Sequence, residues 1–360
     1  MSSPKISVVM SVYNGEVFLA EAVESVLAQS FADFEFIIID DGSTDRAPEI
    51  LSGYARRDAR VRVFPQQNKG RPESLNRGIE ISTAPLIARM DADDISMPRR
   101  VEQQVKLMEA RPEVALLGGP VEFIGHDGAR IGGFRPPETD AEIRIKMLHT
   151  NVFYHPTVMM RREHVLAAGG YRKALLDADD YDLFLRMAER GEMAALAEPV
   201  LAYRVHPNQA SVANLMVQTR CLVAARKAAS LRDRGLPDPL CGVEEISPEF
   251  VRQLGVSDEE VRAYAAGAHV NWIGLLAEVY PDSALRLVDS LLELCDSGSF
   301  ERSAVAAALF RAAGIHFRQG RYAEGLASVC RSVSIQPIEA GRHLKWAIAR
   351  RVAQFSHANR

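Results

Sequence analysis

The segment LIARMDADD, residues 86–94, decides the fold class of this chain. Its first five residues are mostly apolar and have the length of a buried strand, and three carboxylates follow within four residues. Ser96 and Pro98 come next and are typical of a helix start. Carboxylates at the point where a buried strand leaves a sheet can hold a hard divalent cation and, through it, a phosphate. Aspartates ahead of a helix also serve as simple caps, so a metal site and a capping turn are alternatives here.

The residues before this segment alternate between strand-like and helix-like patterns. Apolar, β-branched runs predict strands at 6–12, 34–39, 61–64 and 85–90, and apolar residues at helical spacing predict helices at 17–27, 48–57 and 74–81. Asn14 is the predicted cap of the first helix. Alternation at these lengths predicts an α/β fold, an open, mostly parallel, twisted sheet with helices on both faces.

Small and polar residues follow three of the predicted strands, at 11–15, 40–45 and 91–94. In an open α/β sheet, ligands bind beyond the carboxyl ends of the strands. Asp40 and Asp41 can therefore accept hydrogen bonds from a base or a ribose. The Gly-Ser-Thr-Asp that follows is also a strong turn sequence, which makes a capping turn the alternative. We favour the ligand role because of where the strand ends.

Three further places carry residues suited to chemistry. Lys69 and Arg71 lie in a glycine-containing loop, where they can face a diphosphate or only solvent. Asp179 and Asp180 begin a predicted helix, where they interact with the helix dipole or supply a general base. His206 ends a strand-like run and is either a metal ligand or a structural histidine.

The last third of the chain has a different texture, because alanine becomes dense after Asn214 and helical periodicity dominates. We predict two domains, a sheet domain at 1–212 and an all-α extension at 213–360. Within the extension, 310–337 resembles one tetratricopeptide unit, with Gly320 at the turn between two helices. A helical pair packed on its neighbours is the alternative.

Size and composition limit the class of protein. The chain has 360 residues, 47% of them hydrophobic, which is ample for a core. A formal charge of −4 and scattered Lys and Arg give no reason to expect a nucleic-acid partner. The four cysteines lack metal-ligand spacing, and no signal peptide or membrane-spanning run is evident. We expect a cytoplasmic protein, with peripheral association at the inner face of a membrane left open.

Taken together, the motifs resemble family 2 of the inverting glycosyltransferases, which have the nucleotide-sugar-binding GT-A fold. The matching segments occur in the family's order over roughly residues 4 to 210, and they are ISVVMSVYNGEVFLAEAVESVLAQSF, FEFIIIDDGSTD, NKGRPESLNRGI, LIARMDADDISMPRR, HPTVMMRREHVLAAGGYRK, ADDYDLFLRMAERG and YRVHP. The strand-one exit often carries Pro in the family where Ser11 and Val12 stand here. The resemblance does not reach the helical extension.

The resemblance implies roles for individual residues. A nucleoside, usually uridine, would be held by Ser11, Tyr13, Asn14, Asp40 and Asp41. Asp91 and Asp93 would form the family's Asp-x-Asp motif, with Asp93 a direct ligand of Mn²⁺ or Mg²⁺, Asp91 nearer the ribose or the metal's waters, and His206 approaching the metal or diphosphate. Asp179 and Asp180 fall on the family's acidic pair, so Asp180 is the expected catalytic base. The family usually has the longer Glu where Asp179 stands.

The implied activity is transfer of a sugar from a nucleotide-sugar donor, expected to be a UDP-sugar, to a hydroxyl of a glycan or lipid-linked glycan in surface polysaccharide synthesis. The helical extension would serve dimerisation, a protein partner or acceptor docking. One alternative is an inert transferase-like scaffold that acts through its helices. Another is a haloacid dehalogenase-like phosphatase, whose DxDx(T/V) motif DADDI approaches, although Ile95 and three preceding βα units depart from it. A sugar nucleotidyltransferase would need a Gly-rich basic loop that SVYNGEVF does not supply.

Overall fold

The computed structural model describes residues 3–207, 209, 212, 214–295 and 299–336. The chain forms two compact units, each made of two stretches of sequence. The first unit comprises Met1–Arg204 and Arg220–Leu254, and the second comprises Val205–Thr219 and Gly255–Arg360. Residues 220–254, which the prediction assigns to the helical extension, thus belong to the unit that contains the sheets.

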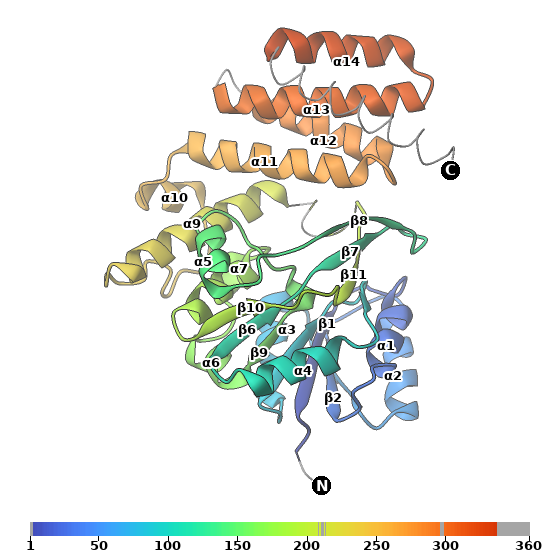
Figure 1. Cartoon of the computed structure of the whole chain (residues 1–360), viewed down its shortest axis with the longest axis vertical. Helices are drawn as coiled ribbons and strands as arrows, with labels where there is room; N and C mark the ends of the chain where they lie inside the picture. The colour runs from blue at the N-terminus through green and yellow to red at the C-terminus, as the bar shows by residue number, and fades with distance from the viewer. Residues whose placement is uncertain (1–2, 208, 210–211, 213, 296–298, 337–360) are drawn as a thin grey trace. The chain divides into compact units, whose positions relative to one another are not determined.

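A seven-stranded sheet forms the centre of the first unit, with the order β10-β6-β9-β4-β1-β2-β3 (Figure 1). The strands are β1 (Ile6–Val12), β2 (Phe34–Asp40), β3 (Val61–Pro65), β4 (Leu86–Met90), β6 (Val114–Gly118), β9 (Met159–Arg161) and β10 (Glu192–Ala195). The neighbouring pairs are parallel except those of β9, which runs antiparallel to β4 and β6. The predicted open, mostly parallel sheet is confirmed.

The register of the central strands aligns their carboxyl ends. Val12 of β1 lies opposite Asp40 of β2, and Met10 lies opposite Met90 of β4. The three polar segments that follow these strands therefore leave the sheet at the same edge, which is where an open α/β sheet binds ligands. Every residue of β2 and β4 is buried, so these two strands lie in the core of the unit.

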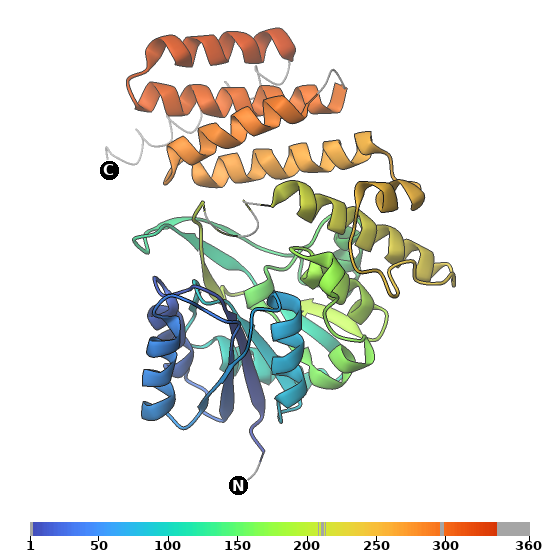
Figure 2. The same ribbon diagram turned by 180° about the vertical axis from the view of Figure 1, so that it is seen from behind.

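Helices cover both faces of the sheet, with α3 on one face and α4 on the other (Figures 1 and 2). The helices and short 3₁₀ turns of the first unit are α1 (Leu19–Leu27), α2 (Ala47–Arg57), α3 (Arg71–Ile81), α4 (Arg100–Ala110), α5 (Asp140–Met147), η1 (His155–Thr157), α6 (Arg162–Ala167), η2 (Lys173–Leu175), α7 (Asp179–Ala188), α9 (Leu215–Asp233, whose first five residues belong to the second unit) and α10 (Pro248–Gln253). Gly78 lets α3 pack closely on β1, because a Cβ there would lie 2.5 Å from Val9 Cγ1.

A second sheet of four strands has the order β5-β11-β7-β8, with β5 (Ile95–Ser96), β7 (Val121–Ile124), β8 (Arg130–Phe134) and β11 (Leu201–Arg204). Two helix starts differ from the prediction for local reasons. Ser96 is in β5, where it lies opposite Leu201 of β11, so α4 begins only at Arg100. Helix α3 begins at Arg71, three residues before the predicted start, because Pro72 suits the first helical turn.

The second unit is helical in the described residues beyond Gly255, which confirms the predicted all-α region. Its helices are α11 (Asp258–Leu276), α12 (Pro281–Leu294), α13 (Ser299–Arg318) and α14 (Tyr322–Ile335). Helices α13 and α14 pack against each other, with Gly320 (φ +74°) in the turn between them. The assignment of this pair as a tetratricopeptide unit stays a prediction. Among the described residues, no helix is both long and apolar enough to cross a membrane.

Candidate active site

Asn14 joins the ends of β1 and β2. It has a left-handed backbone (φ 51°), its N–H donates to Ser43 Oγ (3.0 Å), and its Oδ1 accepts from the N–H of Thr44 (2.8 Å). The prediction that Asn14 caps α1 is wrong, because Phe18 occupies the cap position without a side-chain capping bond. The side chain is instead used to hold two strand exits together.

Asp40 and Asp41 are buried, and both accept bonds from the backbone after their strand. Asp40 Oδ1 accepts from the N–H of Ser43 (3.0 Å), as in the capping turn that the sequence offered as an alternative. Asp41 accepts from the N–H groups of Lys69 and Gly70 (2.9 Å each) and so fixes the loop that leads into α3. Their contact with a nucleoside stays a prediction.

Other residues at this edge are more open. Tyr13 is 55% exposed and Ser11 is half-buried at the end of β1. The side chain of Lys69 is exposed, whereas Arg71 turns away toward α7. An exposed tyrosine at the end of a strand offers an aromatic face on which a base can stack. These positions fit a nucleotide at this edge, and their roles stay predictions.

The acidic turn, by which we mean Asp91, Asp93 and Asp94, follows β4. One oxygen from each carboxylate lies within 4.8 Å of the others. Asp94 is 1% exposed; its Oδ1 accepts from the N–H of Arg204 (2.8 Å), and its Oδ2 has no hydrogen-bond partner. Burial, together with the charges of Asp93 and Asp91, raises the pKa of Asp94 well above its ordinary value of 3.8.

This turn fits a divalent cation. Mn²⁺ and Mg²⁺ take oxygen ligands, and three clustered carboxylates with one unpartnered buried oxygen supply the charge and the donor atoms that such an ion needs. Arg89 of β4 pairs with Asp91.

The acidic helix start, by which we mean Asp177, Asp179 and Asp180, opens α7. Asp179 is fully buried and pairs with Arg71, whose Nη2 also lies 3.7 Å from Asp177 Oδ1. Asp180 accepts from Asn151 Nδ2 (2.9 Å) and from the N–H of Tyr181 (2.7 Å). Burial, with the charge of Asp179, raises the pKa of Asp180 to about 7. A carboxylate with this pKa is suited to accept a proton at neutral pH.

Two arginines link the acidic turn to the acidic helix start. Burial raises the pKa of Asp91 and of Asp180, and the charges of Arg89 and Arg71 lower both. Arg71 and Arg89 are therefore close to both acidic groups, although Asp91 and Asp180 are 89 positions apart in sequence. Two carboxylate clusters of different character thus share one site.

His206 follows β11 and belongs to the second unit. It is half-exposed, and its backbone N–H donates to Gln209 Oε1 (2.8 Å). Its role as a metal or diphosphate ligand stays a prediction.

Comparison with known proteins agrees with this geometry. Residues 7–168 match the family described as Glycosyl transferase family 2. Over 202 residues the chain is 36% identical to the amylovoran biosynthesis glycosyltransferase AmsE of Erwinia amylovora, covering 54% of this chain and 74% of that protein. Over 214 residues it is 34% identical to an uncharacterised glycosyltransferase of Methanocaldococcus jannaschii, covering 58% and 73%.

The chain belongs to glycosyltransferase family 2. As a member of this family it is a glycosyltransferase. A solved structure with a similar fold is the mannosyltransferase PcManGT from Pyrobaculum calidifontis in complex with GDP-Man and Mn²⁺, with a TM-score of 0.50 and 17% identity, covering 92% of this chain and 88% of that one. The likeness supports a GT-A fold.

Sequence reasoning on this family 2 transferase missed Arg204, which fixes the acidic turn. Its guanidinium is almost fully buried, and Nε donates to the carbonyl of Asp93 (2.9 Å). Nη1 donates to the carbonyls of Gly125 and His126 (3.1 and 3.0 Å), and Nη2 pairs with Glu21 of α1. The signal was present in the strand-like run before His206, where one arginine interrupts residues that read as buried.

Two more residues of the site were missed. Arg89 is the one charged residue in the run LIARM, and a lone cation inside a buried strand predicts a partner nearby. Asn151 gives no local signal, because it lies in an irregular stretch 29 residues before its partner Asp180. Only the fold brings it there.

Proposed function

We propose that this glycosyltransferase moves a sugar from a UDP-sugar to a hydroxyl of a glycan or lipid-linked glycan, with inversion at the anomeric carbon. The observation that carries the proposal is the shared position of the acidic turn and the acidic helix start around Arg71 and Arg89. Transfer of a sugar needs one group that receives a proton and another that binds the leaving diphosphate. The acidic helix start is suited to the first task, and the acidic turn, with a cation bound, to the second.

Asp180 is the proposed base. The acceptor hydroxyl gives its proton to the Asp180 carboxylate while its oxygen attacks the anomeric carbon, and the bond from that carbon to the diphosphate breaks in the same displacement. Asn151 and the N–H of Tyr181 orient the carboxylate for this transfer. Asp179 is already neutralised by Arg71, so we assign it to positioning that arginine rather than to proton transfer.

Asp93 and Asp91 are the proposed holders of Mn²⁺ or Mg²⁺. Such an ion, when bound, supplies positive charge that offsets the charge of the leaving diphosphate. Lys69, whose side chain is exposed, is the proposed direct contact with that diphosphate. Arg71 is the proposed second positive charge near the diphosphate. The complex of PcManGT with GDP-Man and Mn²⁺ supports a metal-assisted nucleotide-sugar site in this fold.

The nucleoside is assigned to the ends of β1 and β2. Tyr13 offers an exposed ring for stacking, and Ser11 and Asn14 line the same strand exit. Asp40 and Asp41 remain candidate acceptors for the base or ribose, through whatever capacity their backbone bonds leave. Uridine is the proposed base because the family usually carries it.

The proposed process is assembly of a surface polysaccharide, which the name of the AmsE relative supports. For such a process we propose a cytoplasmic enzyme that works at the inner face of the membrane. The helical unit is then the proposed place for acceptor docking, a partner or a second copy. The boundary at 212/213 remains part of this proposal.

The deciding experiment is a panel of UDP- and GDP-sugars screened for thermal stabilisation with and without Mn²⁺. A ligand that binds the folded state at 100 times its dissociation constant stabilises it by about 2.7 kcal/mol. We expect stabilisation by UDP-sugars that needs Mn²⁺, followed by donor hydrolysis or transfer. If no UDP-sugar stabilises the protein or is turned over, the proposed donor is wrong, and the inert-scaffold alternative gains support.

A further inference from the structure

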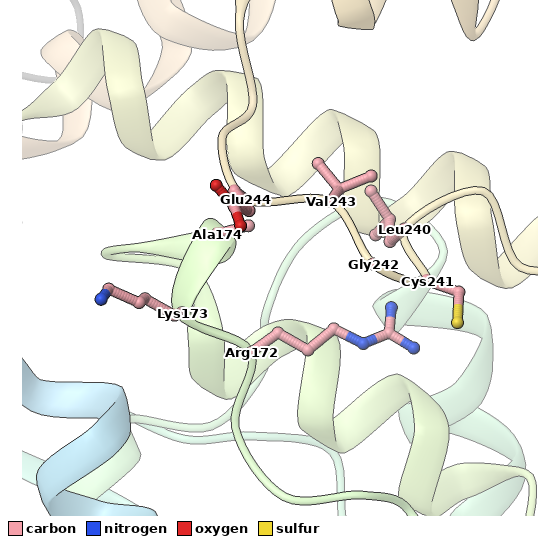
Figure 3. A pocket seen from close by; sticks show the side chains of 8 residues that line it. All are labelled: Arg172, Lys173, Ala174, Leu240, Cys241, Gly242, Val243 and Glu244. Carbon is pink, nitrogen blue, oxygen red and sulfur yellow. The ribbon is translucent and has the colours of Figure 1, made fainter.

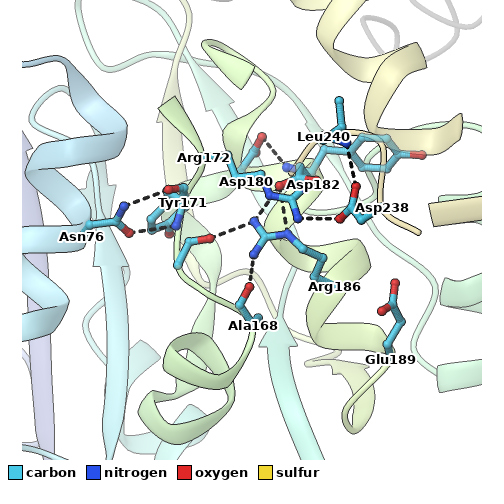
Figure 4. A network of polar contacts seen from close by, with 12 residues as sticks. Asn76, Ala168, Tyr171, Arg172, Asp180, Asp182, Arg186, Glu189, Asp238 and Leu240 are labelled. Carbon is cyan, nitrogen blue, oxygen red and sulfur yellow. Dashed lines mark hydrogen bonds and ion pairs between the residues drawn. The ribbon is translucent and has the colours of Figure 1, made fainter. Parts of the chain in front are cut away.

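The segment 169–180 brings the proposed base to the site, and much of it lacks regular structure. Gly169, Gly170 and Asp177 have left-handed backbones (φ 82°, 67° and 67°), and η2 is its one short helical turn. At its start, the side-chain amide of Asn76 on α3 donates to the carbonyl of Tyr171 and accepts from its N–H (2.8 Å each; Figure 4). The placement of Asp180 therefore depends on the side chains that anchor this segment.

A network of buried and half-buried charges provides the next anchor (Figure 4). Arg172 pairs with Asp182 of α7 (3.5 Å) and with Asp238 (2.5 Å). Arg186, also on α7, pairs with the same Asp182 (2.6 Å) and donates to the carbonyl of Gly170 (2.8 Å). The two arginines thus hold both the glycine pair and the start of η2 against α7.

Asp238 lies in the loop after α9 and completes this network. It accepts from Arg172 and from Arg232 of α9 (3.0 Å), and Arg232 also pairs with Glu189 (2.7 Å). Asp238 Oδ1 accepts from the N–H of Leu240 (2.9 Å), so the loop itself fixes the carboxylate. The bond from Arg172 lowers the pKa of Asp238 despite burial, which keeps the carboxylate charged at neutral pH.

The same loop runs beside the segment. Leu240 to Glu244 face Arg172, Lys173 and Ala174 across a groove of about 510 Å³ (Figure 3). Farther along, Cys221 Sγ of α9 lies 3.8 Å from the carbonyl of Ala174. The segment before the base is therefore contacted by α9 and by its following loop.

We propose that Asp238 is a positioning residue of the transferase site, which holds Arg172 and, through it, the segment that presents Asp180. The inference rests on the proposed role of Asp180 as base. Arg172, Arg186 and Arg232 face Asp182, Asp238 and Glu189, three cations against three anions. Without the Asp238 charge, Arg172 and Arg186 compete for Asp182. Because Arg186 also donates to the carbonyls of Ala168 and Gly170, a shift of Arg186 would move the start of the segment.

The test is Asp238→Asn, with Asp58→Asn as a matched control. Asp58 pairs with Arg60 (2.7 Å) at an exposure close to that of the Arg172–Asp238 pair, between α2 and β3. Misplacement of a reacting group by about 1 Å costs on the order of 100-fold in rate. We expect Asp238→Asn to lower kcat about 10- to 100-fold, with the donor dissociation constant unchanged, and Asp58→Asn to leave both unchanged.

A pH profile separates positioning from general loss of structure. If the segment shifts, Asp180 gains solvent, so the acid side of the kcat profile moves to lower pH in Asp238→Asn. A kcat within about twofold of the wild type, or a reduced kcat with an unmoved acid limb, would overturn the proposal. If Asp238→Asn does not fold, Arg172→Lys, which keeps the charge but not the reach, replaces it under the same criteria. An active Asp180→Asn variant would instead refute the proposed base and leave the network purely structural.

Discussion

The acidic turn and the acidic helix start each place three aspartates within four residues, yet the partners of their carboxylates differ. In the acidic turn, Arg89 pairs with Asp91, and a buried oxygen of Asp94 has no partner. In the acidic helix start, Arg71 neutralises Asp179 and reaches Asp177. The first cluster gathers three carboxylates and leaves one buried oxygen without a partner, which suits an incoming cation. The second supplies its own counter-charge and leaves one carboxylate free to titrate.

The difference shows that adjacent aspartates need not share a role. Asp179 and Asp180 are neighbours in sequence, but one is fully buried in an ion pair and the other accepts two neutral hydrogen bonds. Environment, rather than residue type, separates a structural carboxylate from one with a pKa near neutrality.

The sharpest test of this comparison is Asp180→Asn. The amide cannot accept a proton, so kcat should fall about 10³-fold, within the 10²- to 10⁴-fold range of general-base catalysis. Donor affinity, measured by calorimetry with Mn²⁺, should stay at the wild-type value. Turnover close to that of the wild type would remove Asp180 from the role of base.

The matching change in the acidic turn is Asp93→Ala. We expect the Mn²⁺-dependent part of donor affinity to disappear, a loss of about 100-fold or more, because a direct ligand is removed. Calorimetry of UDP binding with and without Mn²⁺ measures it, and the residual affinity without metal serves as the internal control. Equal Mn²⁺ dependence in variant and wild type would place the ion elsewhere.

A weaker effect is expected from Arg204→Lys, which keeps a charge but cannot bond to the carbonyls of Asp93, Gly125 and His126 together. The loosened turn should bind Mn²⁺ about 10-fold more weakly, a loss typical of supporting residues around metal ligands. The control is Arg130→Lys, because Arg130 is an exposed arginine of the same four-stranded sheet as Arg204. Unchanged Mn²⁺ affinity in the Arg204 variant would mean that the turn is rigid without it.

The smallest effect concerns the pH dependence. In the wild type, kcat should fall as the pH drops through about 7, since Asp180 becomes protonated. Asp179→Asn removes a neighbouring negative charge, which lowers the pKa of Asp180 and extends activity to lower pH. The ratio of kcat at pH 6 to kcat at pH 8 should therefore rise. A ratio equal to that of the wild type would show that Asp179 does not influence the titrating group.

The sequence predicts the fold well because its signals are local. The strands β1 to β4 follow from continuous apolar runs, and their predicted ends lie within one residue of those observed. The clustering of acidic residues at strand ends follows from the parallel topology alone. Asn14 shows the limit of such local prediction. Its hydrogen bonds go to Ser43 and Thr44, 29 and 30 residues away, whereas a capping rule considers only the adjacent helical turn.

The supporting residues are less predictable still. Arg204 reaches Asp93 across 111 residues, and Arg172 reaches Asp238 across 66. A buried arginine needs an anion or carbonyl groups as partners, but the sequence around it does not identify those partners. The different environments of Asp179 and Asp180 likewise depend on Arg71, which lies 108 residues from Asp179 in sequence.

The interleaved path of the chain has a practical consequence. The polypeptide passes from one compact unit to the other three times, after Arg204, Thr219 and Leu254. A fragment that stops at Arg204 would therefore lack both Arg232 and Asp238, whereas a fragment that ends at Leu254 keeps both stretches of the sheet unit together with residues 205–219. Dissection of the sheet unit by proteolysis or gene truncation must therefore retain the stretch through Leu254, which carries residues 205–219 of the second unit with it.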